Sequence, residues 1–198
     1  DSKTVFYNKK DNPLFEDIRF FREDSARNLW IGTNRGGVIL YNMNTSKFEA
    51  QPYINDTILP EDGQVKAMEI DKQNNLWIGT VDGLAIGTIN KQNFERKTQL
   101  DSLTVFGISS LYCDPNGDMW IGSEKMGGKP GLIKYTASQK EFRRVSSVSG
   151  IIPKALLMDR NGILWIGTGQ GVMAFHNDSI VSSLTENDGL LSNNINLL

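Results

Sequence analysis

Short apolar runs recur along this chain, and short polar turns separate them. The clearest stretch begins with VKAMEID (65–71), passes a polar turn to LWIGT (76–80), and continues through LAIGTIN (84–90) to FERKTQL (94–100). Runs of this length bounded by Asp, Asn and Gly predict strands, and no stretch shows a helical stripe. The first three runs suit strands covered on both faces, whereas the mixed fourth run suits an outer edge. The pattern therefore predicts a four-stranded antiparallel meander.

The same four segments occur four times. Each copy contains the phrase Trp-Ile-Gly-Thr/Ser, whose tryptophans are separated by 47, 43 and 45 residues: Trp30, Trp77, Trp120 and Trp165. A period near 45 indicates a repeat architecture, and a four-stranded meander repeated about an axis is a propeller blade. A β-sandwich is the alternative, but it does not account for a strict internal period. We therefore predict an all-β fold, a β-propeller fragment with four complete four-stranded antiparallel blades and partial blades at both ends.

The whole chain, 1–198, is expected to form one partial propeller domain. The complete blades are expected at about 18–53, 65–100, 108–146 and 154–184. Residues 1–10 are expected to hold the last strand of a preceding blade, and 192–198 the first strand of a following blade. Such an arc either leaves its end blades uncovered for another copy of the chain or closes as a small ring.

An aspartate opens the turn before each tryptophan. Two of these turns contain Asn-Gly, which supplies the positive φ angles of a tight hairpin. The carboxylate can accept backbone N–H groups of the turn that it begins. Calcium ligands or catalytic carboxylates are the alternative interpretation, but no second acid accompanies each one at regular spacing. The predicted structural aspartates are Asp24, Asp71, Asp114 and Asp159.

A glycine follows each tryptophan two residues later on the same strand face. A large tryptophan on a middle strand can pack between blades, and a missing side chain beside it lets the next blade approach. Tryptophans that stack on sugar rings would instead need exposed positions at loop ends. The predicted structural glycines are Gly32, Gly79, Gly122 and Gly167.

Composition narrows the candidate chemistry. A net charge of −2 gives no reason to expect nucleic acid, and no apolar run approaches the length of a membrane span. Cys113 and His176 are the only cysteine and histidine, which excludes an ordinary Cys/His zinc site. We interpret Cys113 as a small core residue and His176 as a strand-end residue. No catalytic residue, metal or cofactor is predicted, because no triad or phosphate loop is present.

The repeated phrase resembles the two-component regulator propeller repeat. It reads Asp-x-x-Gly/Asn-x-Leu/Met-Trp-Ile-Gly-Thr/Ser, and the tail Asn187–Ile195 resembles the connector into a next blade. Copy one departs from the pattern with a longer turn that lacks glycine, and copy three inserts 124–130 before its third strand. The resemblance implies the periplasmic sensor region of a hybrid two-component histidine kinase, an inner-membrane protein that detects glycans. It implies no catalysis in this part, and its implied partners are an oligosaccharide, the remaining blades and a second copy.

Loops that join the second and third strands emerge together at one end of a propeller, where ligands often bind. Their residues differ between otherwise similar copies, so specificity could reside there. The alternative is that they are solvated loop residues. The candidate ligand-binding residues are Arg35, Asp82, Glu124, Lys125 and Gln170.

Three functions compete. The leading prediction is a non-catalytic sensor that binds a glycan-derived oligosaccharide and relays a signal to a kinase. The alternative is a structural or dimerisation propeller whose ligand binds elsewhere. A propeller glycoside hydrolase or lyase is less favoured, because a hydrolase needs a carboxylate pair or a tyrosine nucleophile, and the turn differs by one residue from the sialidase Asp-box.

Overall fold

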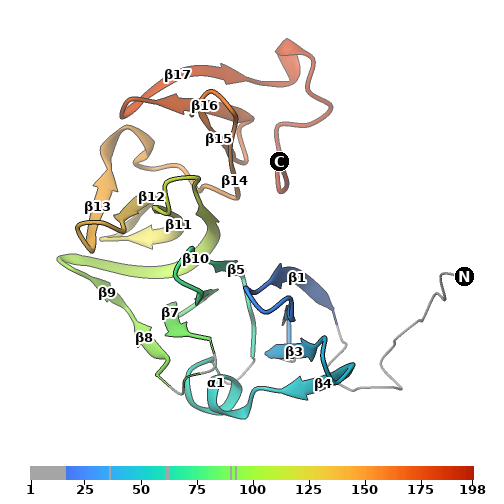
Figure 1. Ribbon diagram of the computed structural model, residues 1–198. Coiled ribbons are helices and arrows are strands. Elements are labelled where there is room, and N and C mark those ends of the chain that lie inside the picture. Colours follow the sequence, from blue (N-terminus) through green and yellow to red (C-terminus); the bar gives the residue numbers. More distant parts are fainter. Residues whose placement is uncertain (1–16, 36, 61–62, 90, 92) are drawn as a thin grey trace, which may run out of the picture.

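The computed structural model describes residues 17–35, 37–60, 63–89, 91 and 93–198. Within them the chain forms four antiparallel sheets, one after another, arranged as an open arc (Figure 1). This arrangement confirms the predicted all-β propeller fold. The strand expected within 1–10 lies outside the described residues.

The first two sheets are four-stranded meanders with neighbouring strands in chain order. The first sheet contains β1 (Ile18–Glu23), β2 (Leu29–Thr33), β3 (Val38–Asn42) and β4 (Lys47–Ala50). The second contains β5 (Ala67–Ile70), β6 (Asn75–Thr80), β7 (Gly83–Thr88) and β8 (Glu95–Lys97). In both sheets the tryptophan phrase forms the second strand, which is covered on both sides by its neighbours.

The third sheet has five strands rather than the predicted four. It contains β9 (Gln99–Leu100), β10 (Leu103–Cys113), β11 (Met119–Met126), β12 (Lys129–Thr136) and β13 (Glu141–Val145). The segment 94–100, predicted as one strand of the second sheet, is therefore divided: β8 ends at Lys97, and Leu100 pairs with Leu103 of the next sheet. The fourth sheet contains β14 (Ala155–Met158), β15 (Leu164–Gly167), β16 (Val172–His176) and β17 (Ser179–Leu184).

Segment 124–130 differs from the expected inserted loop. The strands β11 and β12 both extend into it, and Met126 pairs with Lys129. Gly127 and Gly128 form the tip with φ of 56° and 95°. Two successive residues with positive φ make the tight turn that matches the twist of paired strands, so the insertion lengthens a hairpin.

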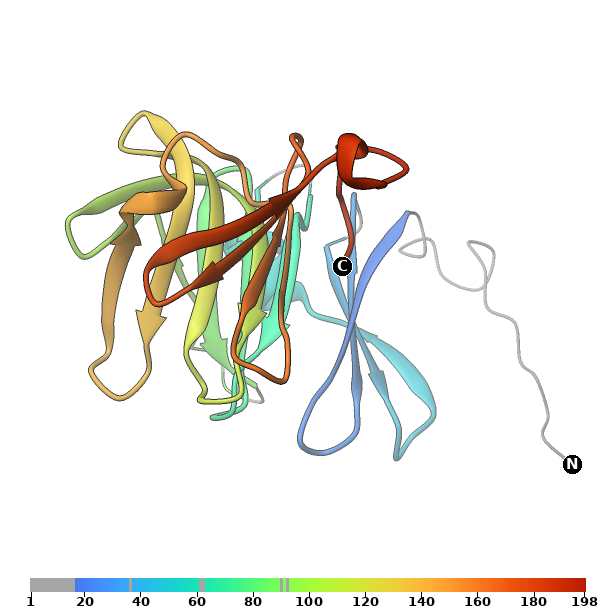
Figure 2. The same cartoon turned by 90° about the horizontal axis from the view of Figure 1, so that it is seen from above.

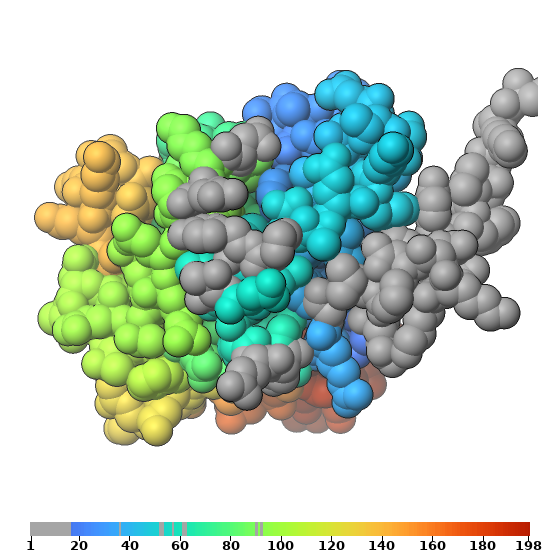
Figure 3. All heavy atoms as spheres, turned by 90° about the horizontal axis from the view of Figure 1, so that it is seen from below, coloured from blue at the N-terminus to red at the C-terminus, as the bar shows by residue number. Residues whose placement is uncertain are grey.

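The described residues include three short helices outside the strands, where the sequence showed no helical pattern. They are α1 (Pro52–Thr57) and the single-turn 3₁₀ helices η1 (Ser146–Val148) and η2 (Glu186–Asp188). Proline begins α1, where its missing N–H leaves no helical hydrogen bond unmade. Figure 3 looks onto the outer edge, where the blue and cyan atoms of the first sheet and the green atoms that follow lie side by side.

The core lies between successive sheets. Glycine in the second strand sets how closely the next sheet approaches: a Cβ at Gly79 would lie 2.6 Å from Ile108 Cγ2, and one at Gly122 would lie 2.6 Å from the carbonyl oxygen of Pro153. Both distances are shorter than any normal contact, so a larger residue would push the sheets apart.

Residues 193–198 form no strand, but they follow the path that leads into a next sheet. The N–H of Ile195 donates to Thr168 O at 2.8 Å, as the N–H of Val65 donates to Thr33 O at 3.0 Å. Ile195 also packs against Gly167, as Val65 packs against Gly32. Figures 1 and 2 show this segment returning toward the concave side of the arc.

Candidate functional site

Each turn aspartate binds the tryptophan of its own sheet. Oδ2 of the aspartate accepts the indole N–H at 3.0, 2.8, 3.0 and 3.1 Å in the four copies. Oδ1 accepts two backbone N–H groups of the turn, for example those of Gln73 and Asn75 at Asp71. These carboxylates are occupied by the fold, so we assign them a structural role.

The tryptophans are buried in the first three sheets. Trp30 and Trp77 are each 2% exposed and Trp120 is 5% exposed. Trp165 of the fourth sheet is only partly buried. The difference follows from position, because the next sheet covers each of the first three tryptophans, whereas only the C-terminal segment follows the fourth sheet.

The five candidate loop residues are all exposed. Asp82 accepts a 3.5 Å hydrogen bond from Arg96 of its own sheet, and Glu124 pairs with Lys66 near the start of β5. The backbone N–H of Gln170 donates to Thr168. Among the residues that the structure describes, none of these bonds joins two of the five, so the loops alone do not assemble a site.

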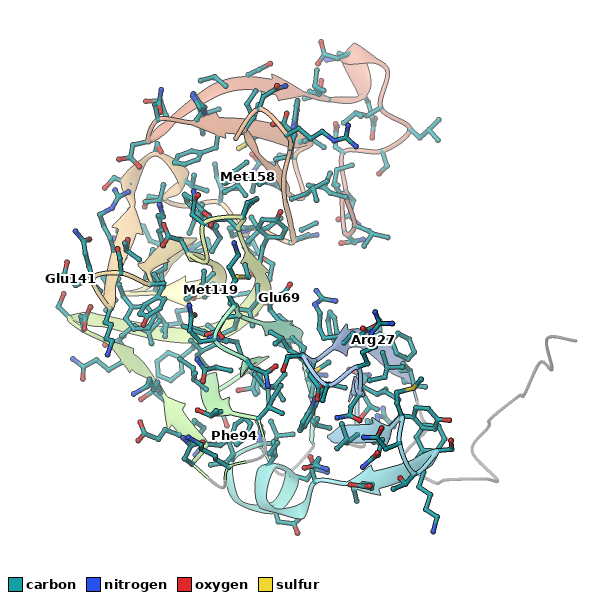
Figure 4. All side chains as sticks on the ribbon, in the orientation of Figure 1. Arg27, Glu69, Phe94, Met119, Glu141 and Met158 are labelled. Carbon is teal, nitrogen blue, oxygen red and sulfur yellow. The ribbon has the colours of Figure 1, made fainter. Side chains whose placement is uncertain are left out.

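A hollow of 490 Å³ lies on the concave side of the arc. The strands β1, β5, β10 and β14, each of which pairs with the tryptophan strand of its sheet, line it together with the C-terminal segment. Figure 4 shows Glu69 on this side and Phe94 and Glu141 toward the outer side. Cavities of this volume commonly hold small molecules.

One position recurs in this lining. The residue directly opposite each tryptophan lies in the preceding strand, eight residues earlier in the chain, and lines the hollow in all four sheets. Its chemistry differs each time: Arg22, Glu69, Tyr112 and Leu157. The sequence interpretation missed this set, because it treated first strands as uniform apolar runs; counting eight residues back from each tryptophan would have found it.

Polar contacts across the hollow join neighbouring sheets. Arg22 Nε lies 2.9 Å from Glu69 Oε1. The hydroxyls of Ser109 and Ser110 donate to Pro153 O at 2.7 and 2.8 Å. A ligand in the hollow would therefore contact groups whose hydrogen bonds hold successive sheets together.

The remaining reactive side chains do not form a catalytic set. Burial raises the pKa of the Cys113 thiol to about 11, so the thiol is protonated at neutral pH. His176 Nδ1 lies 3.3 Å from Gly162 O. Within the described part of the chain, no three His, Cys, Asp or Glu side chains gather as a metal site requires.

Comparison with known proteins identifies the repeated unit. Residues 59–82, 105–125 and 146–170 match the family model described as two component regulator propeller. Over these three segments the chain matches two-component regulator propeller repeats. Each matched segment contains one hydrogen-bonded Asp–Trp pair. In chain order these are the pairs of the second, third and fourth sheets.

Several longer proteins contain a similar region. A curated protein named Histidine kinase P4, from Formosa agariphila, is 27% identical across 99% of this chain and 15% of its own length. Two solved structures are extracellular domains of putative hybrid two-component systems from B. thetaiotaomicron. They are 23% and 21% identical with TM-scores of 0.71 and 0.69, and each match covers 91% of this chain and 24% of the other.

These matches establish the propeller fold. The chain spans about 15% of the kinase and about a quarter of the two extracellular domains. Within the part that the structure describes, the helices are too short and too polar to cross a membrane.

Proposed function

We propose that this propeller is the non-catalytic, periplasmic sensor part of a hybrid two-component histidine kinase. It binds a glycan-derived oligosaccharide and relays that event to the kinase. The repeats and the likeness to extracellular domains of putative hybrid two-component systems support this class of protein. The proposal also includes a following blade that continues from residues 193–198.

The position opposite each tryptophan carries the proposal. Four sheets share one frame, yet at this position they present a guanidinium, a carboxylate, a phenol and an alkyl group to one hollow. A purely structural position does not require four different side chains. A site that recognises a sugar with different groups at each edge does require different side chains. Selectivity of this kind arises when several different side chains contact one ligand.

Relay follows from contacts between sheets. Arg22 and Glu69 belong to neighbouring sheets, and their ion pair lies within the hollow. A saccharide whose hydroxyls compete for either group changes the interaction between those sheets. Because a ligand shifts a conformational equilibrium only through different contacts in the two states, this interface is a suitable coupling point.

The five exposed loop residues are proposed to make further contacts with the ligand outside the hollow. Glu124 is the most informative of them, because its ion pair with Lys66 joins the third sheet to the second. Substitution of one of these loop residues should weaken binding less than substitution of a residue in the hollow, since an exposed charge gains little from a contact that water also supplies.

Calorimetry with the protein and a panel of oligosaccharides tests the proposal. We expect one glycan class to bind, with affinity reduced at least fivefold by Glu69→Gln or Arg22→Met. Glu141→Gln on the outer side is the matched control and should bind normally. Equal binding by all variants, or no binding by any glycan, would contradict the proposed function.

A structural or dimerisation role is the second candidate. The fourth sheet favours it, because Val181 is 56% exposed and Leu157 is 42% exposed while Trp165 is only partly buried. Exposed apolar side chains concentrated on an end sheet suit contact with another blade or a second copy. Sedimentation that shows a stable dimer, together with no glycan binding, would favour this role.

A further inference from the structure

A second pocket lies between the second and third sheets, at the end opposite the candidate loops. Its volume is 610 Å³, and it opens beside the Asp–Trp turn of the second sheet. Three aromatic rings from both sheets form one wall: Trp77, Tyr135 and Phe142. Tyr135 lies 5.2 Å from Trp77 and 4.7 Å from Phe142 between ring centroids, so the three rings form a continuous apolar surface.

The rest of the lining is polar, and its formal charges balance. Its charged members are two acids, Asp71 and Glu95, and two bases, Lys97 and Lys140. Lys97 and Glu95 pair with each other at 3.0 Å, and Asp71 is occupied by the turn and by Trp77. The pocket therefore attracts neither an anion nor a cation by net charge.

Two hydrogen-bonding groups of the lining are available to a ligand. The Tyr135 hydroxyl has no hydrogen-bond partner among the described residues, and the side chain of Gln73 also lines the pocket. Burial, and then the nearby Asp71 carboxylate, raise the pKa of Tyr135, so its phenol is a donor at neutral pH. The lining thus combines an aromatic surface with uncharged donors and acceptors.

The equivalent pocket between the third and fourth sheets is smaller, and a charged pair lies beside its tryptophan. It measures 390 Å³, and Lys134 lies 5.1 Å from the centre of the Trp120 ring while pairing with Asp118 at 2.8 Å. Ile86 of the second sheet and Lys134 of the third occupy equivalent positions, since each pairs directly with the tryptophan of its sheet. An alkyl side chain therefore lies beside the tryptophan of the second sheet, where a lysine lies beside the tryptophan of the third.

We propose that the pocket between the second and third sheets binds a neutral saccharide. The C–H face of a sugar ring packs on Tyr135 and Phe142, and its hydroxyls bond with the Tyr135 hydroxyl and the Gln73 amide. Sugars combine an apolar ring face with a polar edge, which matches a lining that is partly aromatic and partly polar. The inference shares its ligand class with the proposed function and rests on it to that extent, but it concerns a separate site.

Fluorine NMR of the protein labelled with 5-fluorotryptophan tests the site. The four tryptophans give four signals, and Trp77→Phe identifies the one in this pocket. The probes are neutral gluco-, manno- and xylo-oligosaccharides, with a uronic-acid oligosaccharide as the charged comparison. We expect a neutral oligosaccharide to shift the Trp77 signal and the charged one to leave it unchanged.

Three variants locate the effect. Ala137→Phe, which fills the pocket, should abolish the shift, and Tyr135→Phe should weaken binding about three- to tenfold through loss of one hydrogen bond. Tyr112→Phe, in the concave hollow, should leave the Trp77 response unchanged. An unchanged response in Ala137→Phe, a shift caused equally by the charged sugar, or no Trp77 shift with any neutral probe would overturn the inference.

The variants test the proposed hollow site and the proposed pocket site independently. A glycan that binds normally to the pocket variants but weakly to Glu69→Gln leaves the sensor proposal intact and removes the second site. The reverse result keeps the pocket and removes the hollow as the sensing site. Normal melting temperatures of all variants confirm that the comparison concerns binding alone.

Discussion

The indole N–H of Trp77 donates a 2.8 Å hydrogen bond to Oδ2 of Asp71, six residues earlier across the turn. The same oxygen accepts the side-chain amide of Asn75 at 2.9 Å. One carboxylate therefore holds the turn, the strand that follows it and the large ring that fills the space between two sheets. Local turn geometry and packing between sheets depend on the same side chain.

Replacement of the Asp71 carboxylate should destabilise the protein. We expect Asp71→Ala to lower the free energy of unfolding by about 2–4 kcal/mol, because a buried indole N–H and turn N–H groups lose their acceptor. Asp56→Ala, at an exposed position in α1, is the control and should change it by less than about 0.5 kcal/mol. Urea unfolding followed by fluorescence measures both. A loss below about 1 kcal/mol for Asp71→Ala would show that the hydrogen bonds are replaced by water.

Close approach of the sheets should depend on Gly79. A methyl group there would lie 2.6 Å from Ile108 Cγ2, so we expect Gly79→Ala to cost about 1–3 kcal/mol of stability. Gly169→Ala is the matched control: its φ is not positive, and the nearest atom to a new Cβ is Lys154 Nζ at 3.6 Å. Thermal melting of the two variants should separate them by several degrees. Equal melting temperatures would contradict the proposed spacing role.

The ion pair in the hollow should couple the first two sheets. Its side chains are 35% exposed at Arg22 and 15% at Glu69, so water weakens the attraction. A double-mutant cycle with Arg22→Met and Glu69→Gln should give a coupling energy of about 0.5–1 kcal/mol. High salt should reduce it. Zero coupling at low salt would leave the relay proposal without this contact.

The Cys113 thiol should react only in strong alkali. Its pKa is raised to about 11 by burial, whereas an ordinary thiol ionises near 9. The rate of alkylation by iodoacetamide should therefore increase with pH, and it should reach half of its maximum at about pH 11. The unfolded thiol loses its proton first, so stability from this group is complete below pH 9 and is lost as pH rises toward 11. A midpoint near 9 would show that the thiol is reached by local opening.

The strand order could be predicted from the sequence because it depends on local signals. Tryptophans with a period near 45 and turns of Asp, Asn and Gly indicated successive meanders. The two-residue turn at Gly127-Gly128 was misinterpreted as part of an inserted loop, although adjacent glycines are a usual signal for a tight hairpin. The short α1 could not be predicted, since six residues show no helical period.

The candidate site was harder to predict for a physical reason. The strands that precede the tryptophan strands were expected to be uniform apolar runs covered on both faces, but β1 is mostly exposed, and the role of Arg22 and Glu69 is visible only when the register aligns them opposite the tryptophans. The aromatic wall of the second pocket joins residues about 60 positions apart, Trp77 and Tyr135, and no local pattern connects them. Spacing within one repeat is visible in the sequence, but contacts between repeats depend on how sheets stack.

The hydrogen bond between aspartate and tryptophan also has a consequence for assembly during synthesis. Each such bond spans only six residues, and each glycine contact waits for the segment of chain that follows its own sheet. A sheet can therefore form as soon as its own segment leaves the ribosome, and the following repeat then covers its tryptophan. Because short-range contacts close quickly and neighbours interact in series, the chain is suited to build itself blade by blade from its amino-terminal side.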